Sequence, residues 1–286
     1  MSLRYVKIKP LKNTPPFRKI ALATWRLPRN PTVYGTLEVD LTKANAWRKK
    51  HAGKGPKITV LPMVARAVAV AMEKYPDLNG YVRFGRIYLR QSIDMFFQVM
   101  TEHETGRQDL TGIHIKELNR KGVHKIAQNI AGQVDRARNK KDLDIQKTSG
   151  IFNVLPSLVV RMLLAIVAFI SYTLNIRFPG IPKDSMGACM ITNIGSLGLD
   201  TGYAPLIPWS RVPMIIALGQ AKPRPVVIDG KVEVKDIVTL NATIDHRFCD
   251  GALMSNMVRV VQKVFDNPDE YFGGPEEEAD GGEAIS

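Results

Sequence analysis

Residues 245–251 read Asp-His-Arg-Phe-Cys-Asp-Gly. Apolar and polar residues alternate over 238–244, just before them, which predicts a strand with one buried face. Apolar residues then recur at helical spacing over 252–265, which predicts a helix. His246 therefore lies where a strand passes through a tight turn into a helix, and catalytic side chains are often placed on such loops. Imidazole suits general base chemistry because its ordinary pKa lies near neutrality.

Period-two and helical patterns extend along the rest of the chain. Strands are predicted at 34–41, within 83–99 (two strands), and at 187–193, 213–219, 224–229 and 232–245. Helices are predicted at 43–50, between Pro62 and Pro76, and at 123–138. A turn at Asp229-Gly230 is expected to join the last two strands.

The other histidines lie in polar or charged stretches, and we interpret them as surface residues; they are His51, His103, His114 and His124. His246 alone is expected beside a buried strand.

The composition is that of an ordinary globular protein, with 45% hydrophobic and 23% charged residues among 286. The two cysteines, Cys189 and Cys249, are far apart and in no metal-ligand spacing, so neither a disulfide framework nor a metal site is expected. The N-terminus lacks the apolar run of a signal peptide. These features predict a cytoplasmic protein.

The net charge of +13 is unevenly distributed. Residues 267–286 hold seven acidic residues and no Lys or Arg, and 273–286 are expected to form a disordered acidic tail. The strongly basic remainder suits phosphate-bearing ligands or anionic lipid head groups, and it is equally typical of a solvated basic surface. A nucleic-acid partner would rest on charge alone, without a recognisable module, and we expect none.

Residues 145–182 form an apolar segment of a different kind. Met162 to Ile170 is a run of nine apolar residues, but Arg161 and the prolines at 156, 179 and 182 keep the segment short of the roughly twenty apolar residues of a membrane span. A helical hairpin, buried or at an interface, is the expected structure. The segment suggests either a hydrophobic acyl chain as substrate or an acceptor at a membrane surface, with peripheral membrane contact through residues 158–176; extra packing between subunits is the alternative.

Five motifs occur in the order found in one enzyme family. They are Phe17-Arg18-Lys19-Ile20-Ala21, the strand from Tyr34 to Asp40, the helix through Ala67–Ala71 with Tyr75-Pro76-Asp77-Leu78-Asn79, Ile191-Thr192-Asn193-Ile194-Gly195, and Asp-His-Arg-x-x-Asp-Gly at 245–251. Together they span roughly residues 15–272, and they resemble the catalytic domain of the dihydrolipoyl acyltransferases of 2-oxoacid dehydrogenase complexes. The resemblance implies a two-layer α+β sandwich, a mixed β-sheet flanked by helices, with the fold of chloramphenicol acetyltransferase. It implies one catalytic domain over residues 1–272, with an apolar helical insert near 145–182.

The resemblance also implies roles for particular residues. His246 matches the general base, and Thr192 matches the hydroxyl that stabilises the tetrahedral oxyanion. Asp250 and Arg18 match a carboxylate–guanidinium pair that holds the turn in shape. In this family the site lies between the subunits of a trimer, so the resemblance implies a homotrimer or a larger assembly of trimers, with coenzyme A as a substrate and no metal.

Each of these assignments has a structural alternative. Asp250 is also suited to cap the helix that follows it, and Thr192 is also an ordinary strand residue. Cys249 is more readily a small buried residue than a nucleophile. Asp245 is expected to orient the turn, and Asn193, Gly195 and Gly198 to shape one.

The sequence departs from the family pattern in three places. The chain begins almost directly at the catalytic domain, so no lipoyl attachment is expected in it. The family's Gly-Leu-x-x-Pro-Val stretch is replaced by residues 101–110, and the link that carries the apolar segment is longer by roughly thirty residues. We predict an acyltransferase that moves an acyl group between coenzyme A and a thiol or hydroxyl acceptor. The alternative is an inactive trimeric scaffold for a 2-oxoacid dehydrogenase-like assembly.

Overall fold

A mixed β-sheet forms the frame of the molecule. Its strand order is β1-β9-β7-β6-β4-β5, and β8 pairs with the outer part of β9. β4, β6 and β7 run parallel to one another, whereas β1, β5 and β9 are antiparallel to their neighbours. The computed structural model describes residues 31–53, 55–102, 108–138, 156–176, 184 and 186–273. Arg18 and the acidic tail beyond residue 273 lie outside these residues.

The elements of the described residues have the following bounds. The strands are β1 (Thr32–Asp40), β2 (Gly80–Arg83), β3 (Arg86–Leu89), β4 (Met95–Glu102), β5 (Gln108–Ile115), β6 (Cys189–Asn193), β7 (Met214–Leu218), β8 (Lys222–Ile228) and β9 (Lys231–Asp245). The helices are α2 (Thr42–Lys50), α3 (Val60–Lys74), α4 (Val123–Arg138), α6 (Ser157–Ala168), α7 (Gly251–Asp266) and α8 (Pro268–Tyr271). Four short helical turns are η1 (Pro76–Asn79), η2 (Leu118–Arg120), η3 (Phe169–Thr173) and η4 (Gly195–Leu197).

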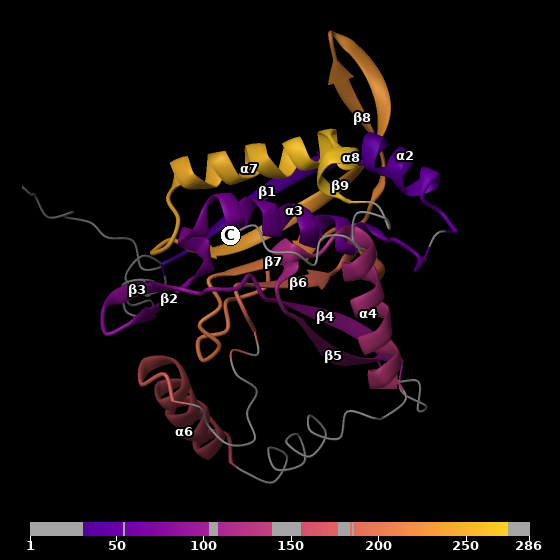
Figure 1. The fold of residues 1–286 in the computed structure, drawn as a ribbon. Helices are drawn as coiled ribbons and strands as arrows, with labels where there is room; N and C mark the ends of the chain where they lie inside the picture. The colour runs from indigo at the N-terminus through magenta and orange to yellow at the C-terminus, as the bar shows by residue number, and fades with distance from the viewer. Residues whose placement is uncertain are drawn as a thin grey trace, which may run out of the picture. The chain divides into compact units, whose positions relative to one another are not determined.

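Helices cover one face of the sheet. α3 and α7 lie side by side across it, and α4 packs against α3 (Figure 1). The apolar run that defines α3 is buried over most of its length, and α7 buries a single stripe that includes Met257, Val261 and Val264. Alternate residues of the strands, such as Ile191, Ile216 and Leu240, complete this core. The predicted mixed sheet with flanking helices is confirmed.

The opposite face of the sheet is more polar. Met190 and Ile215 form a small second cluster with Val212, and β9 buries Asn241 and Thr243 on this side. Asn241 donates hydrogen bonds to the carbonyl oxygens of Asp200 (3.0 Å) and Ala217 (3.3 Å). The loop that follows β6 is thereby fixed to the sheet.

Two hairpins extend the fold. β8 and the first half of β9 form an antiparallel ribbon that extends past the helices (Figure 1). The predicted turn at Asp229-Gly230 closes it, with φ angles of 49° and 78°. β2 and β3 form a separate two-stranded sheet, where the sequence predicted a single strand ahead of β4.

The prediction that the other histidines are surface residues is wrong for two of them. His124 is only 5% exposed and lies against the ring of Trp47, with 5.5 Å between centroids. Burial and the neighbouring His51 lower the pKa of His124. His114 is half-buried and faces the Asp94 carboxylate at 3.8 Å. The sequence did not predict this burial because both histidines lie in stretches with many polar or charged residues. The apolar side chains that cover His124 come from distant elements.

Within the predicted apolar insert, the described residues form α6 and the π-helical turn η3. α6 is twelve residues long, and its last residue, Ala168, is buried. None of the helices in the described part of the chain is long and apolar enough to cross a membrane.

Candidate active site

The turn after β9 holds His246 in a defined tautomer. The His246 ring nitrogen Nδ1 lies 2.5 Å from the carbonyl oxygen of Cys249. Because a carbonyl oxygen can only accept, Nδ1 must carry the hydrogen, and the lone pair of the neutral ring is then on Nε2. The side chain is exposed on the single chain. Nε2 is therefore the atom that can accept a proton from a bound substrate.

Asp245 holds the first half of the turn. Its carboxylate is 6% exposed and accepts hydrogen bonds from the backbone N–H of Arg247 (3.0 Å) and from the Arg247 guanidinium, with Nε–Oδ1 at 2.9 Å and Nη2–Oδ2 at 2.5 Å. This fork is the bidentate arrangement that fixes both partners. The hydrogen bond to Asp245 also raises the pKa of Arg247. This geometry ties Asp245 to the backbone and side chain of Arg247 within the turn; its orienting role in the site stays a prediction.

Asp250 holds the second half of the turn. Its carboxylate accepts a hydrogen bond from the backbone N–H of Leu253 at 2.8 Å and caps α7. A capping carboxylate satisfies one of the free N–H groups of the first helical turn. The capping alternative is thus present in the structure. The pairing with Arg18 falls outside the described residues.

Cys249 is a buried thiol and does not have the properties of a nucleophile. Its side chain is 3% exposed. Burial, followed by the negative charges of Asp250 and Asp77, raises the pKa of the Cys249 thiol to about 11. The thiolate is the reactive form, and at neutral pH this group is protonated. The contribution of Cys249 to the site is its carbonyl oxygen, for which the sequence offers no signal.

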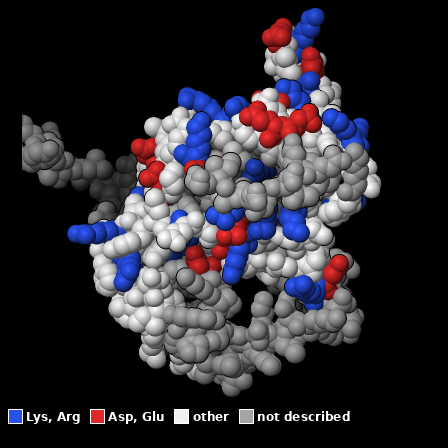
Figure 2. All heavy atoms as spheres, in the orientation of Figure 1, with Lys and Arg blue, Asp and Glu red and all other residues white. Residues whose placement is uncertain are grey.

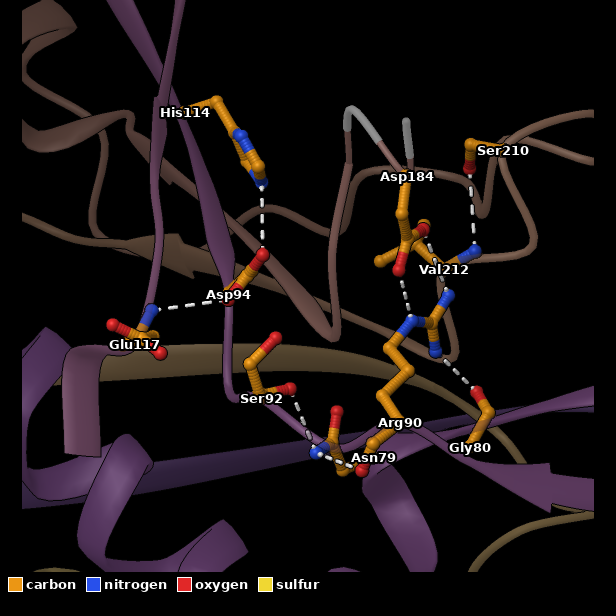
Figure 3. Close-up of polar contacts among 10 residues, drawn as sticks. All are labelled: Asn79, Gly80, Arg90, Ser92, Asp94, His114, Glu117, Asp184, Ser210 and Val212. Carbon is orange, nitrogen blue, oxygen red and sulfur yellow. Dashed lines mark hydrogen bonds and ion pairs between the residues drawn. The ribbon is translucent and has the colours of Figure 1, made fainter. Parts of the chain in front are cut away.

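A network of hydrogen bonds surrounds Gly80 at the start of β2 (Figure 3). Asn79, the last residue of the Pro-x-x-Asn motif, is buried and donates to the carbonyl oxygens of Arg90 (3.3 Å) and Ser92 (3.0 Å). Arg90 donates to the carbonyl oxygen of Gly80 at 2.6 Å and grips the carboxylate of Asp184 at 2.6 and 3.3 Å. Gly80 is thereby tied to segments that are distant in sequence.

Gly80 is also the point where this network meets the turn. A Cβ atom added at Gly80 would lie 3.2 Å from the ring of Phe248 and 3.1 Å from the carbonyl oxygen of Asp77. A side chain at this position would require Phe248 and the other neighbours to shift by a few tenths of an ångström. The turn therefore rests on β2 through a close aromatic contact.

Thr192 lies near the end of β6, at the end of the sheet opposite to the turn that holds His246. It pairs with Ala217 on β7, and Ala217 pairs with Asn241 on β9, five residues before His246. The rise of a strand and the spacing between strands place Thr192 roughly 16 Å along the sheet and about 10 Å across it from the end of β9. A base and an oxyanion donor must each lie about 3 Å from the reacting group. His246 and Thr192 of one chain thus cannot serve the same substrate.

Thr192 is followed by a tight turn. Thr192 is half-buried, and its side chain makes no hydrogen bond within the part of the chain that the structure describes. Gly195 follows at a point where an added Cβ would lie 2.5 Å from the carbonyl oxygen of Gly219. Gly198 adopts a φ of 77°. These glycines shape the turn after β6.

No group of three His, Cys, Asp or Glu side chains in the described ranges is placed to hold a metal ion. The functional groups that the structure brings together are His246, the carbonyl oxygen of Cys249, Asp245 and Asp250.

Comparison with known proteins decides the family. The chain matches the family described as 2-oxoacid dehydrogenases acyltransferase (catalytic domain) over residues 21–154 and 182–273, which is most of its length. The chain belongs to this acyltransferase family. The match omits residues 155–181, which include α6 and η3.

A comparison with individual proteins gives a relative of the same kind. The dihydrolipoyllysine-residue acetyltransferase component of the pyruvate dehydrogenase complex of Bacillus subtilis is 27% identical over 236 residues, covering 81% of this chain and 44% of that protein. The chain thus spans less than half the length of this acyltransferase relative.

Solved structures share the fold. The Azotobacter vinelandii dihydrolipoamide acetyltransferase superposes with a TM-score of 0.60 at 19% identity, covering 85% of this chain and 84% of the other. The cubic core of the pyruvate dehydrogenase multienzyme complex also gives a TM-score of 0.60 at 19% identity, covering 93% and 95% of the two chains.

Proposed function

We propose that the chain is a cytoplasmic acyltransferase that moves an acyl group between coenzyme A and a thiol or hydroxyl acceptor. Membership of the acyltransferase family supports the reaction class. The observation that carries the mechanism is the hydrogen bond from His246 Nδ1 to the carbonyl oxygen of Cys249, because it leaves Nε2 free to act as the base.

The proposed reaction uses few groups of the protein. His246 Nε2 removes the proton of the attacking thiol or hydroxyl, whose sulfur or oxygen forms a bond to the acyl carbonyl carbon. The carbonyl oxygen becomes an oxyanion, which the Thr192 hydroxyl stabilises by donating a hydrogen bond. The intermediate then collapses: the bond to the leaving thiolate breaks, and the imidazolium returns its proton to that sulfur. No charge remains on the protein.

We propose that each site lies between two subunits of a homotrimer. The separation of His246 and Thr192 at opposite ends of the sheet supports this, because only a second copy can bring the hydroxyl to the base. The exposure of His246 on the isolated chain agrees with it. The fold is also that of a protein that builds the cubic core of a multienzyme complex.

Spacing supports the choice of residues. In the solved Azotobacter vinelandii acetyltransferase, a serine, a histidine and an asparagine have roles in the catalytic mechanism. The histidine follows the serine by 52 residues, and the asparagine follows the histidine by four. In this chain His246 follows Thr192 by 54 residues, and Asp250 follows His246 by four. Thr192 and Asp250 thus stand close to the positions of the serine and the asparagine.

Replacing the base tests the proposal. His246→Ala is expected to lower kcat for transfer from an acyl-CoA to a small thiol by about 100- to 10,000-fold, the usual contribution of a positioned general base. Cys249→Ser is the matched control: it keeps the backbone carbonyl that holds His246, so most of the activity should remain.

A wild-type rate equal to that of His246→Ala, with trimers intact in both proteins, would support the scaffold alternative instead. A Cys249→Ser protein as inactive as His246→Ala would point to a thiol nucleophile, contrary to the proposal.

A further inference from the structure

Apolar side chains gather on a surface outside the active site. This surface, which we name the docking face, consists of α6, η3 and the β2–β3 hairpin. On the helical side, Met162 is 58% exposed, Phe169 51% and Ile176 56%. On the hairpin, Phe84 is 66% exposed and Leu89 51%. Exposed apolar residues are ordinary when scattered, but a contiguous group indicates an interaction site.

The helical part and the hairpin form one surface because they are bonded together. The Arg83 guanidinium Nε donates to the carbonyl oxygen of Thr173 at 2.6 Å. The rings of Tyr81 and Tyr172 meet edge to face, with 6.0 Å between centroids. Arg83 also lies over the rings of Phe84 and Tyr88, at 5.6 Å from each. The tip of the hairpin is therefore held beside the end of the apolar helix.

The hairpin tip carries an unusual residue. Phe84 and Gly85 occupy the two central positions of the turn, with φ angles of 47° and 71°. This left-handed conformation favours Asn or Gly at both positions and is strained for a bulky side chain. A large aromatic ring is nevertheless placed there, with two thirds of its surface in water. Folding of the hairpin does not explain that choice, whereas insertion into an apolar phase does.

The charge on the docking face has one sign. Residues 80–90 contain three arginines, residues 157–176 contain one, and neither segment contains Asp or Glu. Asp184 neutralises Arg90, which leaves Arg83, Arg86 and Arg161. On the side shown in Figure 2, most side chains over α6 are uncharged, and Lys or Arg side chains lie over the adjacent hairpin.

We infer that the docking face binds the surface of a membrane rich in anionic lipids. The apolar side chains would enter the boundary between head groups and acyl chains, and the arginines would lie among the anionic head groups. A two-fold contact between copies is a poorer occupant, since it would place arginines against arginines; a three-fold contact would place this face against a different surface of the neighbour, and the self-association measurement below tests that case. The twelve-residue α6 lies on such a surface and does not span it.

Binding of the docking face would bring the turn that holds His246 close to the membrane. β2 is four residues long, and its first residue, Gly80, contacts Phe248 of the turn. The hairpin tip at Phe84 is thus roughly 13 Å along the strand from Gly80, where β2 contacts the turn that holds His246. Membrane binding itself does not depend on acyl transfer and should be equal in the His246→Ala protein.

Vesicle flotation of the full chain tests the inference. Wild type is expected to float with phosphatidylcholine vesicles that contain phosphatidylglycerol, and much less with phosphatidylcholine alone or at high salt, because salt screens the arginines. Phe84→Asn should weaken binding about tenfold or more through the lost apolar area, while Asn keeps the left-handed turn intact. The double variant Arg86→Glu and Arg161→Glu should abolish the preference for anionic vesicles.

Val232→Thr is the control, because Val232 is 70% exposed on the β8–β9 ribbon, outside the docking face; it should bind as wild type does. Failure of the wild-type protein to float with anionic vesicles overturns the inference, as does equal binding to both vesicle types. Phe84-dependent self-association without vesicle binding would assign the face to a second copy and overturn it as well. Each of these results leaves the acyl transfer assay of His246→Ala unaffected.

Discussion

His246 depends on backbone atoms and carboxylates for its orientation. Its tautomer is fixed by the carbonyl oxygen of Cys249, while Asp245 and Asp250 hold the two halves of the turn. The sequence was enough to single out His246, because the strand, turn and helix around it leave clear patterns. It could not show the acceptor of the Nδ1 hydrogen, since every residue has a carbonyl group and only the folded turn selects one.

Asp250 offers a test that separates two roles at the residue scale. Asp250→Asn keeps a side-chain oxygen for the N–H of Leu253, so the free energy of unfolding should change by less than about 0.5 kcal/mol. Asp250→Ala removes the cap and should cost about 1 kcal/mol. Urea unfolding measures both.

Activity assays of the same two variants address Arg18. If Asp250 acts as a cap, the Asn variant retains most of its acyl transfer. If the Asn variant is as inactive as the Ala variant, a charged partner such as Arg18 is required and capping is not the essential role.

At the scale of elements, the β2–β3 hairpin connects the active-site turn with the apolar insert. Gly80 contacts the turn at one end, and Arg83 binds η3 at the other. Arg90 holds the start of this hairpin: its side chain is 5% exposed and it binds both Asp184 and the carbonyl oxygen of Gly80.

Arg90→Lys is therefore expected to destabilise the fold despite the retained charge. A single ammonium group cannot reproduce the planar fork that reaches Asp184 and Gly80 together, and the loss should be about 2 kcal/mol in urea unfolding. The matched control is Arg120→Lys, in an exposed pair with Glu117, where a change below about 0.5 kcal/mol is expected. Equal effects of the two substitutions would show that the Arg90 network does not stabilise the fold.

Sequence patterns predicted some elements better than others, for physical reasons. α4 was predicted to the residue at both ends because its apolar positions follow the helical period. The β2–β3 hairpin was missed because Ile87, Tyr88 and Leu89 are all exposed, so no alternation marks a buried face. β5 begins in the polar stretch at 108, where the partner strand β4 and not the local composition determines the structure.

At the scale of the whole molecule, the position of Thr192 determines how the site is built. The sequence placed Thr192 at a strand end, but only the register through β7 shows how far it lies from His246. The sequence alone therefore predicted roles for both residues without the geometry that separates them.

Mixed trimers test this arrangement directly. His246→Ala and Thr192→Ala proteins are each expected to be inactive. After joint unfolding and refolding in equal amounts, about a quarter of the sites should combine an intact His246 with an intact Thr192 from its neighbour. Acyl transfer by the mixture measures the recovery. The same two proteins refolded separately and then combined without subunit exchange form the control, and absence of recovery after joint refolding would place the site within one chain.

The placement of the two residues at opposite ends of one sheet has a genetic consequence. Two alleles that each lack one residue would complement each other in trans. The same two substitutions in cis would act dominantly, because one such subunit disables two of the three sites in every proposed trimer that it joins.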